Sequence, residues 1–457
     1  MEALSLYEIN EAINGKILRK KSEGPFYNIN TDTRTIKSGD VFLALKGENF
    51  DGNLYVQQAI EKGASLCIVD HLEDEDNLSN SSSTVILVDS SREALKALAK
   101  YYREKLKIKV VGITGSTGKT STKDLMAAAL SGKYKVFKTK GNFNNDIGLP
   151  LMILSMDSSY DVAVLEMGMS NLNEIHQLSY VANPEIAVIT NVGVSHLENL
   201  KTRENILKAK MEITDFFDEK NVLIVNGDND YLSTVKSSKF LVKKIGYNVK
   251  NSEFIYDVQD IINNESGIEY DILEKRTGKT AHIALSTPGE HNVLNSQLAI
   301  AVAREMGLEF EEIQKGFQNI ESTSMRLELI ESSNIRIVND SYNASPDSVR
   351  AGIDYLNVLN GKRKICILGT MRELGDNSYQ LHKEVAVYAK DKGIDVLLVN
   401  SEFSEAFVEG FNGGKVKCFK TNEELASYYN SIKEKGDAVL VKASRSMKFE
   451  NIVAKIM

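Results

Sequence analysis

A chain of 457 residues is long enough for about three domains, and its hydrophobic content of 42% is sufficient to build their cores. The formal net charge of -8 argues against broad binding to nucleic acid or to an anionic membrane surface, because both need a basic face. There is no apolar run of about 18 residues and no apolar segment near the start, so we expect neither a membrane span nor a signal peptide. With three widely spaced cysteines, these features indicate a cytoplasmic protein.

The first 106 residues predict a small α/β domain. Arg34 and Lys46, with the glycines near them, are candidates for binding an anionic group. Solvated surface charge is the simpler interpretation of the same residues. The expected elements are an amphipathic helix at 4–13, strands at 29–32, 41–45 and 66–69, a polar surface loop at 74–83 and a helix at 91–105.

Residues 110–124, VVGITGSTGKTSTKD, contain the most informative motif of the chain. An apolar strand is followed by a glycine-rich loop and a helix-forming run, an order that binds phosphate through backbone N–H groups and a helix N-terminus. Lys119 adds a mobile positive charge, and the Thr120 hydroxyl is a candidate ligand of Mg²⁺. Ile113 stands where the commonest form of this loop has its first glycine. The chain is therefore expected to bind a nucleoside triphosphate through Gly115, Ser116, Thr117, Gly118, Lys119, Thr120 and Ser121.

From 107 to 321, apolar strands alternate with helical runs, the pattern of a mostly parallel sheet. The strand expected at 161–166 ends on Glu166. Because ligands gather at the carboxyl edge of such sheets, Glu166 is a candidate Mg²⁺ ligand, although a plain strand-end acid has the same pattern. The strand expected at 186–190 leads to His196, which at such a position is more often structural than a ligand.

The helix expected at about 203–217 carries a lysine on its apolar face. Lys210 lies four residues after Ile206 and three before Ile213, so it shares their face, whereas Lys208 lies off it. An inward lysine usually extends to water or pairs with an acid. The sharper alternative is an amine that is chemically modified or held against charge, and the residues alone do not choose between the two.

Residues 254–285 predict a pair of β-strands in a hairpin. In the helix that follows, Asn292 and Asn295 share a face at i, i+3, where they either contact a base edge or cap and pack the helix.

A third βαβ unit is expected from about residue 322, with strands at 335–339, 364–368, 396–400 and 438–442. Asp340 ends its first strand, and Ser345 and Pro346 are typical of a helix start. The expected fold class is therefore α/β, with domains at 1–106, 107–321 and 322–457.

A series of motifs runs in order along nearly the whole chain: TxTR…GDxFxALxG…DG (31–52), GITGSTGKTS (112–121), NFNNDIGLP (142–150), EMGMS (166–170), SHLE (195–198), KAKMEI (208–213), PGxHNxxN (288–295), NDSYNASP (339–346) and KASRS (442–446). Together they resemble the motifs of the Mur ligases, ATP-dependent amide-bond-forming enzymes of bacterial peptidoglycan synthesis. The resemblance implies a small UDP-binding domain, a central P-loop ATPase domain and a Rossmann-like last domain that binds the incoming dipeptide and closes on the nucleotide.

The resemblance also implies a catalytic set with two Mg²⁺ sites. The lysine matching Lys210 is carbamylated in the family, and its carbamate would bind one Mg²⁺ together with His196. Thr120 and Glu166 would serve the other Mg²⁺, on the ATP phosphates, and Lys119 would act on the transferring group.

Further site residues follow from the same resemblance. Asn292 and Asn295 would face the adenine, while Arg326 and Asp340 would close over the nucleotide from the last domain. The UDP end of the substrate site would include Thr33, Arg34, Lys46 and Gly47, and further substrate contacts are expected from Asn142, Asn145, Asn343 and Ser345.

The asparagine-rich loop and the DSYNA motif favour the family member that adds D-alanyl-D-alanine to UDP-N-acetylmuramoyl-tripeptide through an acyl phosphate. Its sister, which adds diaminopimelate or lysine, should carry an Asp-Asn-Pro-Arg type motif, and this sequence has none. Thr370 and Ala443 depart from the family pattern on the dipeptide side, where an acid and a glycine are usual, and Thr33 replaces a common serine. We expect a monomer that acts on small molecules and not on nucleic acid.

Three alternatives remain open. Another member of the superfamily would add a different amino acid, or glutamates to a folate. A P-loop phosphotransferase would stop at a phosphorylated product, and a nucleotide-switch protein would catalyse neither step, but neither of these two explains an inward Lys210.

Overall fold

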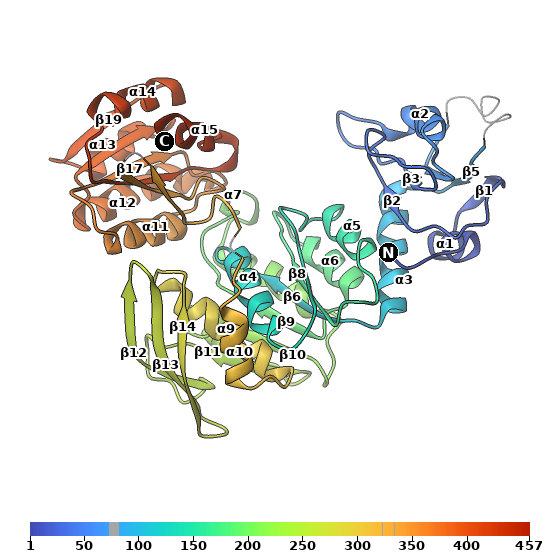
Figure 1. Cartoon of the computed structure of the whole chain (residues 1–457), viewed down its shortest axis with the longest axis horizontal. Coiled ribbons are helices and arrows are strands. Elements are labelled where there is room, and N and C mark those ends of the chain that lie inside the picture. Colours follow the sequence, from blue (N-terminus) through green and yellow to red (C-terminus); the bar gives the residue numbers. More distant parts are fainter. Residues whose placement is uncertain (73–81, 322, 333) are drawn as a thin grey trace. The chain divides into compact units, whose positions relative to one another are not determined.

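The computed structural model of the chain describes residues 1–72, 82–321, 323–332 and 334–457 (Figure 1). Most of the surface loop expected at 74–83 lies outside these residues, as does residue 322 at the expected start of the third domain. Within the described ranges, no helix combines the length and apolar character that crossing a membrane requires. The chain divides into two compact units, the first comprising Met1–Gly112, Tyr134–Gly168 and Glu174–Glu185, and the second Ile113–Lys133, Met169–Asn173 and Ile186–Met457.

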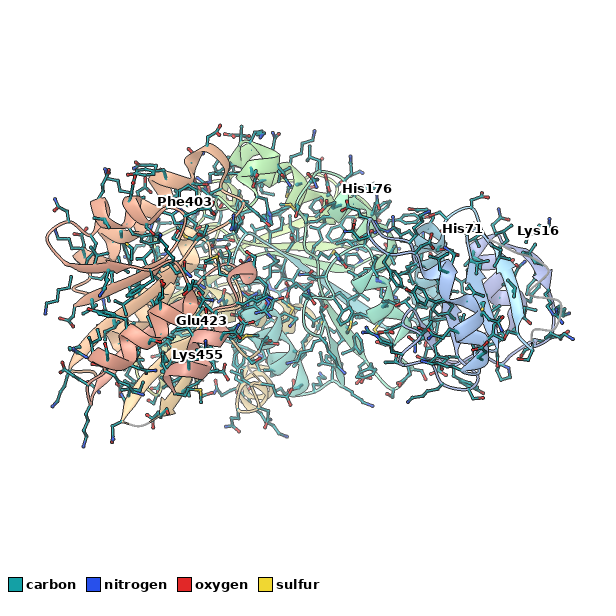
Figure 2. All side chains as sticks on the ribbon, turned by 90° about the horizontal axis from the view of Figure 1, so that it is seen from above. Lys16, His71, His176, Phe403, Glu423 and Lys455 are labelled. Atoms are coloured by element: carbon teal, nitrogen blue, oxygen red, sulfur yellow. The ribbon has the colours of Figure 1, made fainter. Side chains whose placement is uncertain are left out.

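The first unit opens with a five-stranded sheet in the order β1-β5-β4-β3-β2. β1 pairs antiparallel with β5, and the other neighbours are parallel. Lys16 at the start of β1 and His71 just after β4 are labelled in Figure 2. The elements are α1 (Leu6–Ile13), β1 (Lys16–Arg19), β2 (Ile29–Asn30), β3 (Val41–Leu43), α2 (Val56–Glu61), β4 (Leu66–Val69), β5 (Thr84–Leu87) and α3 (Ser91–Leu106).

The rest of the first unit consists of two parallel strands and two helices. The Tyr102 hydroxyl of α3 donates to Met156 O (2.7 Å), so α3 belongs to this part as well as to the first sheet. The elements are β7 (Val136–Lys138), α5 (Gly148–Leu154), β8 (Val162–Glu166), which pairs with β7, and α6 (Glu174–Ala182).

The second unit begins inside β6 (Lys109–Thr114), which leads into α4 (Lys119–Ser131). Every residue of β9 and β10 is buried, as is typical of parallel strands covered on both faces. Further elements of this part are β9 (Ile186–Ile189), α7 (Leu197–Leu200), α8 (Arg203–Met211), β10 (Val222–Asn226) and β11 (Leu241–Ile245), with β9, β10 and β11 as successive parallel neighbours.

Residues 254–285 form three antiparallel strands, so the expected two-strand hairpin was wrong by one strand. Residues 275–278 form the turn between the second and third strands, where Gly278 has φ of +71° and its N–H donates to Glu274 O (2.8 Å). The strands are β12 (Tyr256–Asn264), β13 (Gly267–Glu274) and β14 (Lys279–Leu285), and the helices after them are α9 (His291–Glu305) and α10 (Phe310–Phe317).

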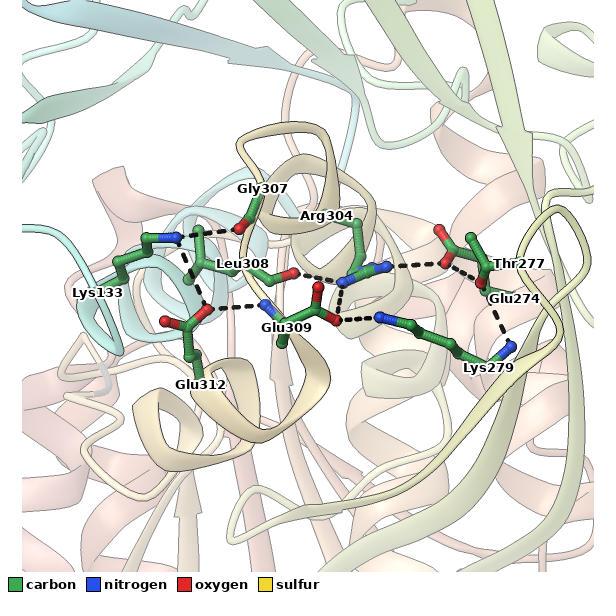
Figure 3. A network of polar contacts seen from close by, with 9 residues as sticks. All are labelled: Lys133, Glu274, Thr277, Lys279, Arg304, Gly307, Leu308, Glu309 and Glu312. Atoms are coloured by element: carbon green, nitrogen blue, oxygen red, sulfur yellow. Dashed lines mark hydrogen bonds and ion pairs between the residues drawn. The ribbon is translucent and has the colours of Figure 1, made fainter.

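A polar network ties these strands to the two helices (Figure 3). Arg304 of α9 donates to Glu274 of β13 (3.0 Å), to Leu308 O (2.6 Å) and to Glu309 (2.8 Å). Glu309 also accepts from Lys279 of β14 (2.7 Å). The Arg304 and Glu274 side chains are 11% and 8% exposed, so each neutralises the other inside the protein.

The last part of the second unit is a six-stranded sheet in the order β15-β16-β20-β17-β18-β19, with only β15 antiparallel. Successive strand residues pack into two different cores: Ile337 faces α14 and α15, whereas Val338 faces α11, α12 and α13. The elements are β15 (Glu328–Ser332), β16 (Ile335–Asn339), α11 (Pro346–Val358), β17 (Arg363–Gly369), α12 (Ser378–Asp391), β18 (Val396–Asn400), α13 (Ser404–Gly410), β19 (Lys415–Cys418), α14 (Asn422–Ile432), β20 (Asp437–Lys442) and α15 (Glu450–Ile456).

Candidate functional site

Two glycines shape the loop between β6 and α4. Gly118 lies at the N-cap of α4 with φ of +77°, and Gly115 has φ of +154°. A Cβ on Gly115 would lie 1.8 Å from Thr190 Oγ1, so a side chain there would displace Thr190, the residue that follows β9. Because α4 starts at Lys119, its free N–H groups lie at the loop, as binding of phosphate requires.

The residues after β9 hold the loop in this shape. Asn191 accepts from Thr117 N–H (2.8 Å) and donates its amide to Thr117 Oγ1 (2.6 Å). The Gly193 N–H donates to Ser116 Oγ (3.0 Å). The loop is therefore organised before any ligand arrives, and this lowers the entropy cost of binding.

Two cationic side chains border the loop. Lys119 Nζ donates to Gly115 O (2.7 Å), and Arg326 Nη2 lies 3.5 Å from Thr120 Oγ1. Both line a cavity of about 90 Å³ together with all the predicted loop residues from Ser116 to Ser121. A phosphate group in this cavity would meet two positive charges and a helix N-terminus.

The two predicted asparagines of α9 lie beside this loop. Asn295 Nδ2 donates to Asn292 Oδ1 (3.2 Å), Asn292 donates to Pro288 O (2.9 Å), and Asn295 accepts from the Thr122 hydroxyl (3.1 Å). Asn292 borders a cavity of about 430 Å³ and Asn295 one of about 230 Å³, and Arg326 borders both. The structure thus brings these amides, Arg326 and the phosphate loop together.

Asp340 lies at the end of β16 and forms a buried ion pair with Lys442. Lys442 also donates to Asn343 O (2.8 Å), and burial lowers the pKa of Lys442 even though Asp340 opposes the shift. Asp340 and Lys442 both line the cavity of about 230 Å³. Lys442 was not among the predicted site residues, although it begins the KASRS motif (442–446) at the end of the strand that pairs with β16.

Lys210 is 1% exposed, which confirms the inward position predicted for it, and Lys208 is exposed. The helix ends earlier than expected, at Met211, and continues as a short 3-10 turn. Lys210 Nζ forms no ion pair with the described residues. Burial, and to a smaller extent the charge of Lys119, holds the pKa of Lys210 well below its ordinary 10.5, which favours a neutral amine.

His196 lies at the N-cap of α7, where its Nδ1 is 2.5 Å from Glu373 Oε2. Glu373 belongs to the loop after β17, far away in the sequence. The contact, more than the opposing effect of burial, lowers the pKa of Glu373. Glu373 was not among the predicted site residues, although it lies in the polar loop that follows the strand expected at 364–368.

Glu166 lies in the first unit, where it is 3% exposed at the end of β8. It accepts from the Asn144 amide (3.0 Å), and its own N–H donates to Thr139 Oγ1 (2.9 Å). Asn144 comes from the asparagine-rich loop but was not predicted, whereas the predicted Asn145 accepts from the N–H of Gly148 (2.8 Å), the first residue of α5. For Asn142, the described contact is its carbonyl, which accepts from Asn144 N–H (2.8 Å).

The residues predicted for the UDP end are on the surface of the first unit. Arg34 is paired with Asp32 (2.7 Å) and Lys46 with Asp51 (3.4 Å). The Thr33 hydroxyl donates to Gln58 (2.6 Å), and Gly47 N–H donates to Phe50 O (2.7 Å). In the second unit, Asn343 and Ser345 both line the cavity of about 90 Å³, and Ser345 is the N-cap of α11 as expected.

Comparison with known families matches the chain in three consecutive parts. Residues 25–103 match the catalytic domain of the Mur ligase family, residues 113–303 the Mur ligase middle domain and residues 325–445 the Mur ligase glutamate ligase domain. The expected α/β fold with parallel sheets is thereby confirmed, and the domain boundaries stay a prediction.

Relatives extend the likeness over almost the whole chain. The UDP-N-acetylmuramoyl-tripeptide–D-alanyl-D-alanine ligase of Bacillus subtilis is 40% identical over 98% of this chain and 97% of its own. The structure of MurF from Acinetobacter baumannii has a TM-score of 0.90 at 29% identity, covering 100% of this chain and 99% of that one. MurF ligase from Thermotoga maritima, solved in complex with ADP, has a TM-score of 0.81 at 28% identity, covering 94% and 96%. A relative at this identity over nearly the full length shows that the chain belongs to the Mur ligase family.

Proposed function

We propose that the chain is an ATP-dependent ligase that adds D-alanyl-D-alanine to UDP-N-acetylmuramoyl-tripeptide in peptidoglycan precursor synthesis. The name of the Bacillus subtilis relative and the ADP in the Thermotoga maritima structure support the two substrates and the nucleotide. One observation favours a ligase over a phosphotransferase. Lys210 is a buried lysine with a lowered pKa and no ion-pair partner among the described residues.

The environment of Lys210 fits a carbamate. A neutral amine attacks CO₂, forming an N–C bond and releasing one proton, and the product is an anion. Lys119, whose charge acts on Lys210, would then attract the modified side chain instead of repelling it. Burial disfavours the charged lysine, and a cation beside the carbamate would compensate its charge.

The proposed metal ligands fit Mg²⁺ bound with a nucleotide. Among the described residues, no three His, Cys, Asp or Glu side chains cluster as a metal site. Mg²⁺ in nucleotide sites takes one or two protein ligands and completes its shell with phosphate oxygens and water. We assign Thr120 and Glu166 to one Mg²⁺, and His196 and the Lys210 carbamate to the other. When bound, the cations would neutralise charge on the transferring phosphoryl group.

The reaction we propose has two steps. The terminal carboxylate of the tripeptide attacks the γ-phosphorus of ATP, and ADP leaves, giving an acyl phosphate. The dipeptide amine then attacks the carbonyl carbon, phosphate leaves, and the amine loses one proton. Lys119, Arg326 and the N–H groups of α4 border the cavity where charge develops, so they would stabilise the transferring group by position and charge.

The nucleotide base and the domain arrangement complete the proposal. Asn292 and Asn295 would face the adenine, and Arg326 and Asp340 would approach the nucleotide from the last domain, whose closure would exclude water. The proposed domains are 1–106 for the UDP substrate, 107–321 for ATP and 322–457 for the dipeptide.

Substrate contacts are proposed for residues on both units. Thr33, Arg34, Lys46 and Gly47 would contact the UDP end, and Asn142, Asn145, Asn343 and Ser345 the remaining substrate. We further propose a cytoplasmic monomer; the burial of Cys67 and Cys366 as free thiols is consistent with a reducing compartment.

The test is a reconstitution with ATP, Mg²⁺, UDP-N-acetylmuramoyl-tripeptide and D-alanyl-D-alanine, followed by mass spectrometry. The expected product is the tripeptide substrate with a mass gain of one dipeptide, with stoichiometric ADP and phosphate. Phosphate release that needs only one acceptor would contradict a ligase. A product with single amino acids or with a folate, but not with the dipeptide, would identify another branch of the superfamily.

A further inference from the structure

The loop after β17 reaches the loop that carries His196 through two contacts. The His196 ring nitrogen Nδ1 lies 2.5 Å from Glu373 Oε2, and the Glu198 N–H donates to Glu373 O (3.2 Å). Nδ1 is buried and has no hydrogen-bond partner among the described residues, and Glu373 Oε2 lies within hydrogen-bonding distance of it. A Cβ on Gly375 would lie 3.2 Å from Glu198 Cα, which shows how closely the two loops approach.

Both partners of this contact have left-handed backbone conformations. His196 has φ of +66° and Glu373 has φ of +65°, a region that non-glycine residues seldom adopt. The pair gains little stability in return, because the Glu373 side chain is 52% exposed and exposed ion pairs are weak.

The two residues before Glu373 are held by α12 and by the segment after β20. Met371 N–H donates to His382 Nε2 (2.8 Å) in α12, and Arg372 N–H donates to Ser444 Oγ (2.8 Å). The His382 ring stacks on Phe403, which is labelled in Figure 2, at 4.6 Å between centroids. The strained loop is therefore fixed from its own domain and presents a carboxylate to His196.

We propose that Glu373 is a positioning residue that accepts the Nδ1–H of His196 and so leaves the Nε2 lone pair free to bind a cation. This inference rests on the proposed function, since it takes His196 as a Mg²⁺ ligand. Carboxylates commonly orient metal-binding histidines in this way and fix which ring nitrogen carries the proton. Glu373 and His196 come from segments far apart in the chain, the loop after β17 and the residue before α7, so the second unit must fold to bring them together.

The first test reads the proton position directly. Full-length protein labelled with ¹⁵N-histidine is studied by NMR at a pH where His196 is neutral and without nucleotide, and the His196 signals are assigned with His196→Gln. We expect the Nδ1–H form in the wild type and in Glu373→Gln, whose amide oxygen still accepts, and a shift to the Nε2–H form in Glu373→Ala. An Nε2–H form in the wild type, or an unchanged form in Glu373→Ala, would overturn the proposal.

A matched control separates the carboxylate from general damage to the loop. Glu402 pairs with Arg372 (2.8 Å), so Glu402→Gln removes a nearby charge without touching His196, and it should retain the wild-type form. Glu373→Gly relieves the backbone strain while removing the acceptor. We expect it to melt at or above the temperature of Glu373→Ala and to share its altered proton position.

The second test measures cation binding, with Mn²⁺ titrated into the protein–ADP complex and free Mn²⁺ followed by electron paramagnetic resonance. Glu373→Ala should weaken Mn²⁺ binding by about 10-fold or more, and Glu402→Gln should leave it unchanged. Unaltered Mn²⁺ affinity in Glu373→Ala would contradict a positioning role. Neither readout uses turnover, so the two proposals can fail separately. If the ligase assay fails and the NMR spectra show the expected proton positions, only the proposed function is overturned. If the ligase assay succeeds and the NMR spectra do not show them, only this inference is overturned.

Discussion

Because Gly115 has no side chain, the hydroxyl oxygen of Thr190 can lie against it. A Cβ at position 115 would lie only 1.8 Å from that oxygen. Thr190 in turn donates to Thr117 O (2.5 Å), so the two residues together set the shape of the phosphate loop. We predict that Gly115→Ala weakens ADP binding at least about tenfold, because displaced N–H groups no longer point at the phosphates. Isothermal titration with ADP measures the change.

The control is Gly278→Ala, at a turn between β13 and β14. Gly278 also has positive φ (+71°), but nothing lies within 4 Å of its Cβ position. The substitution should cost about 1 kcal/mol of stability through backbone strain and leave ADP binding unaltered. Equal losses of ADP affinity in both variants would show that strain, and not the clash with Thr190, is responsible.

Lys210→Ala should abolish turnover while the protein remains folded, because the proposed carbamate is lost. Small carboxylates such as acetate should restore part of the activity by occupying the place of the carbamate. Lys208→Ala, on the exposed face of the same helix, should retain activity. Steady-state phosphate release with and without acetate measures both, and full activity of Lys210→Ala would rule out the carbamate.

Gln297→Met should stabilise the protein. Gln297 is fully buried in α9, and neither its Nε2 nor its Oε1 has a hydrogen-bond partner among the described residues. Removing two unsatisfied polar atoms at nearly constant volume should gain about 1 kcal/mol, seen as a higher melting temperature.

The neighbouring Ser296 provides the opposite case for comparison. Its hydroxyl donates to Asn292 O (2.6 Å) and is hydrogen-bonded to the Tyr270 hydroxyl (2.7 Å). Ser296→Ala leaves Tyr270 without this partner and should lose about 1 kcal/mol. If both variants shift the melting temperature in the same direction, hydrogen-bond satisfaction does not govern stability here.

Stability should fall on mild acidification, in part because of His382. Burial lowers the pKa of this ring below the ordinary 6.5 and so favours its neutral form. The neutral ring's contribution to the free energy of unfolding is fully present above pH 6.5. As pH falls from 6.5 through the lowered pKa, the unfolded chain binds a proton before the folded chain does, and this contribution is lost. His382→Gln should flatten the melting temperature between pH 7 and 5 relative to the wild type.

Two other histidines bear on that measurement. Burial also lowers the pKa of His291, so part of the slope should remain in His382→Gln. His282 has a raised pKa, chiefly through its hydrogen bond with Asp271, which gives the opposite sign, but its side chain is 58% exposed and its effect is small. If the melting temperature of His382→Gln changes with pH as steeply as that of the wild type, His382 does not contribute to the acid sensitivity.

Arg304→Met should be strongly destabilising, since it leaves Glu274 buried without its cation. The loss should be about 3 kcal/mol, and the double variant Arg304→Met/Glu274→Met should recover most of it, because two apolar side chains need no partner. Lys279→Met removes the exposed ion pair with Glu309 in the same network and should cost less than about 1 kcal/mol. Thermal melts of the wild type, the two single variants and the double variant measure the order of their stabilities.

Local chemistry allowed much of the fold to be predicted. The strand at β18 and the N-cap at Ser345 were placed correctly, because apolar runs and capping residues act within a few neighbours. The expectation of two strands at 254–285 missed one of the two turns of the β12–β14 sheet. Lys210 was predicted to point inward from helical spacing alone, and its burial confirms this.

The sequence by itself determined that a phosphate loop lies between a strand and a helix, since the glycines and Lys119 act on residues next to them. It also determined, through the family resemblance, which residues to examine. Only the tertiary structure decided that Thr190 requires Gly115 and that Glu373 lies against His196. These contacts join segments far apart in the chain, and their geometry follows from how sheets and helices pack, which no local pattern of residues encodes.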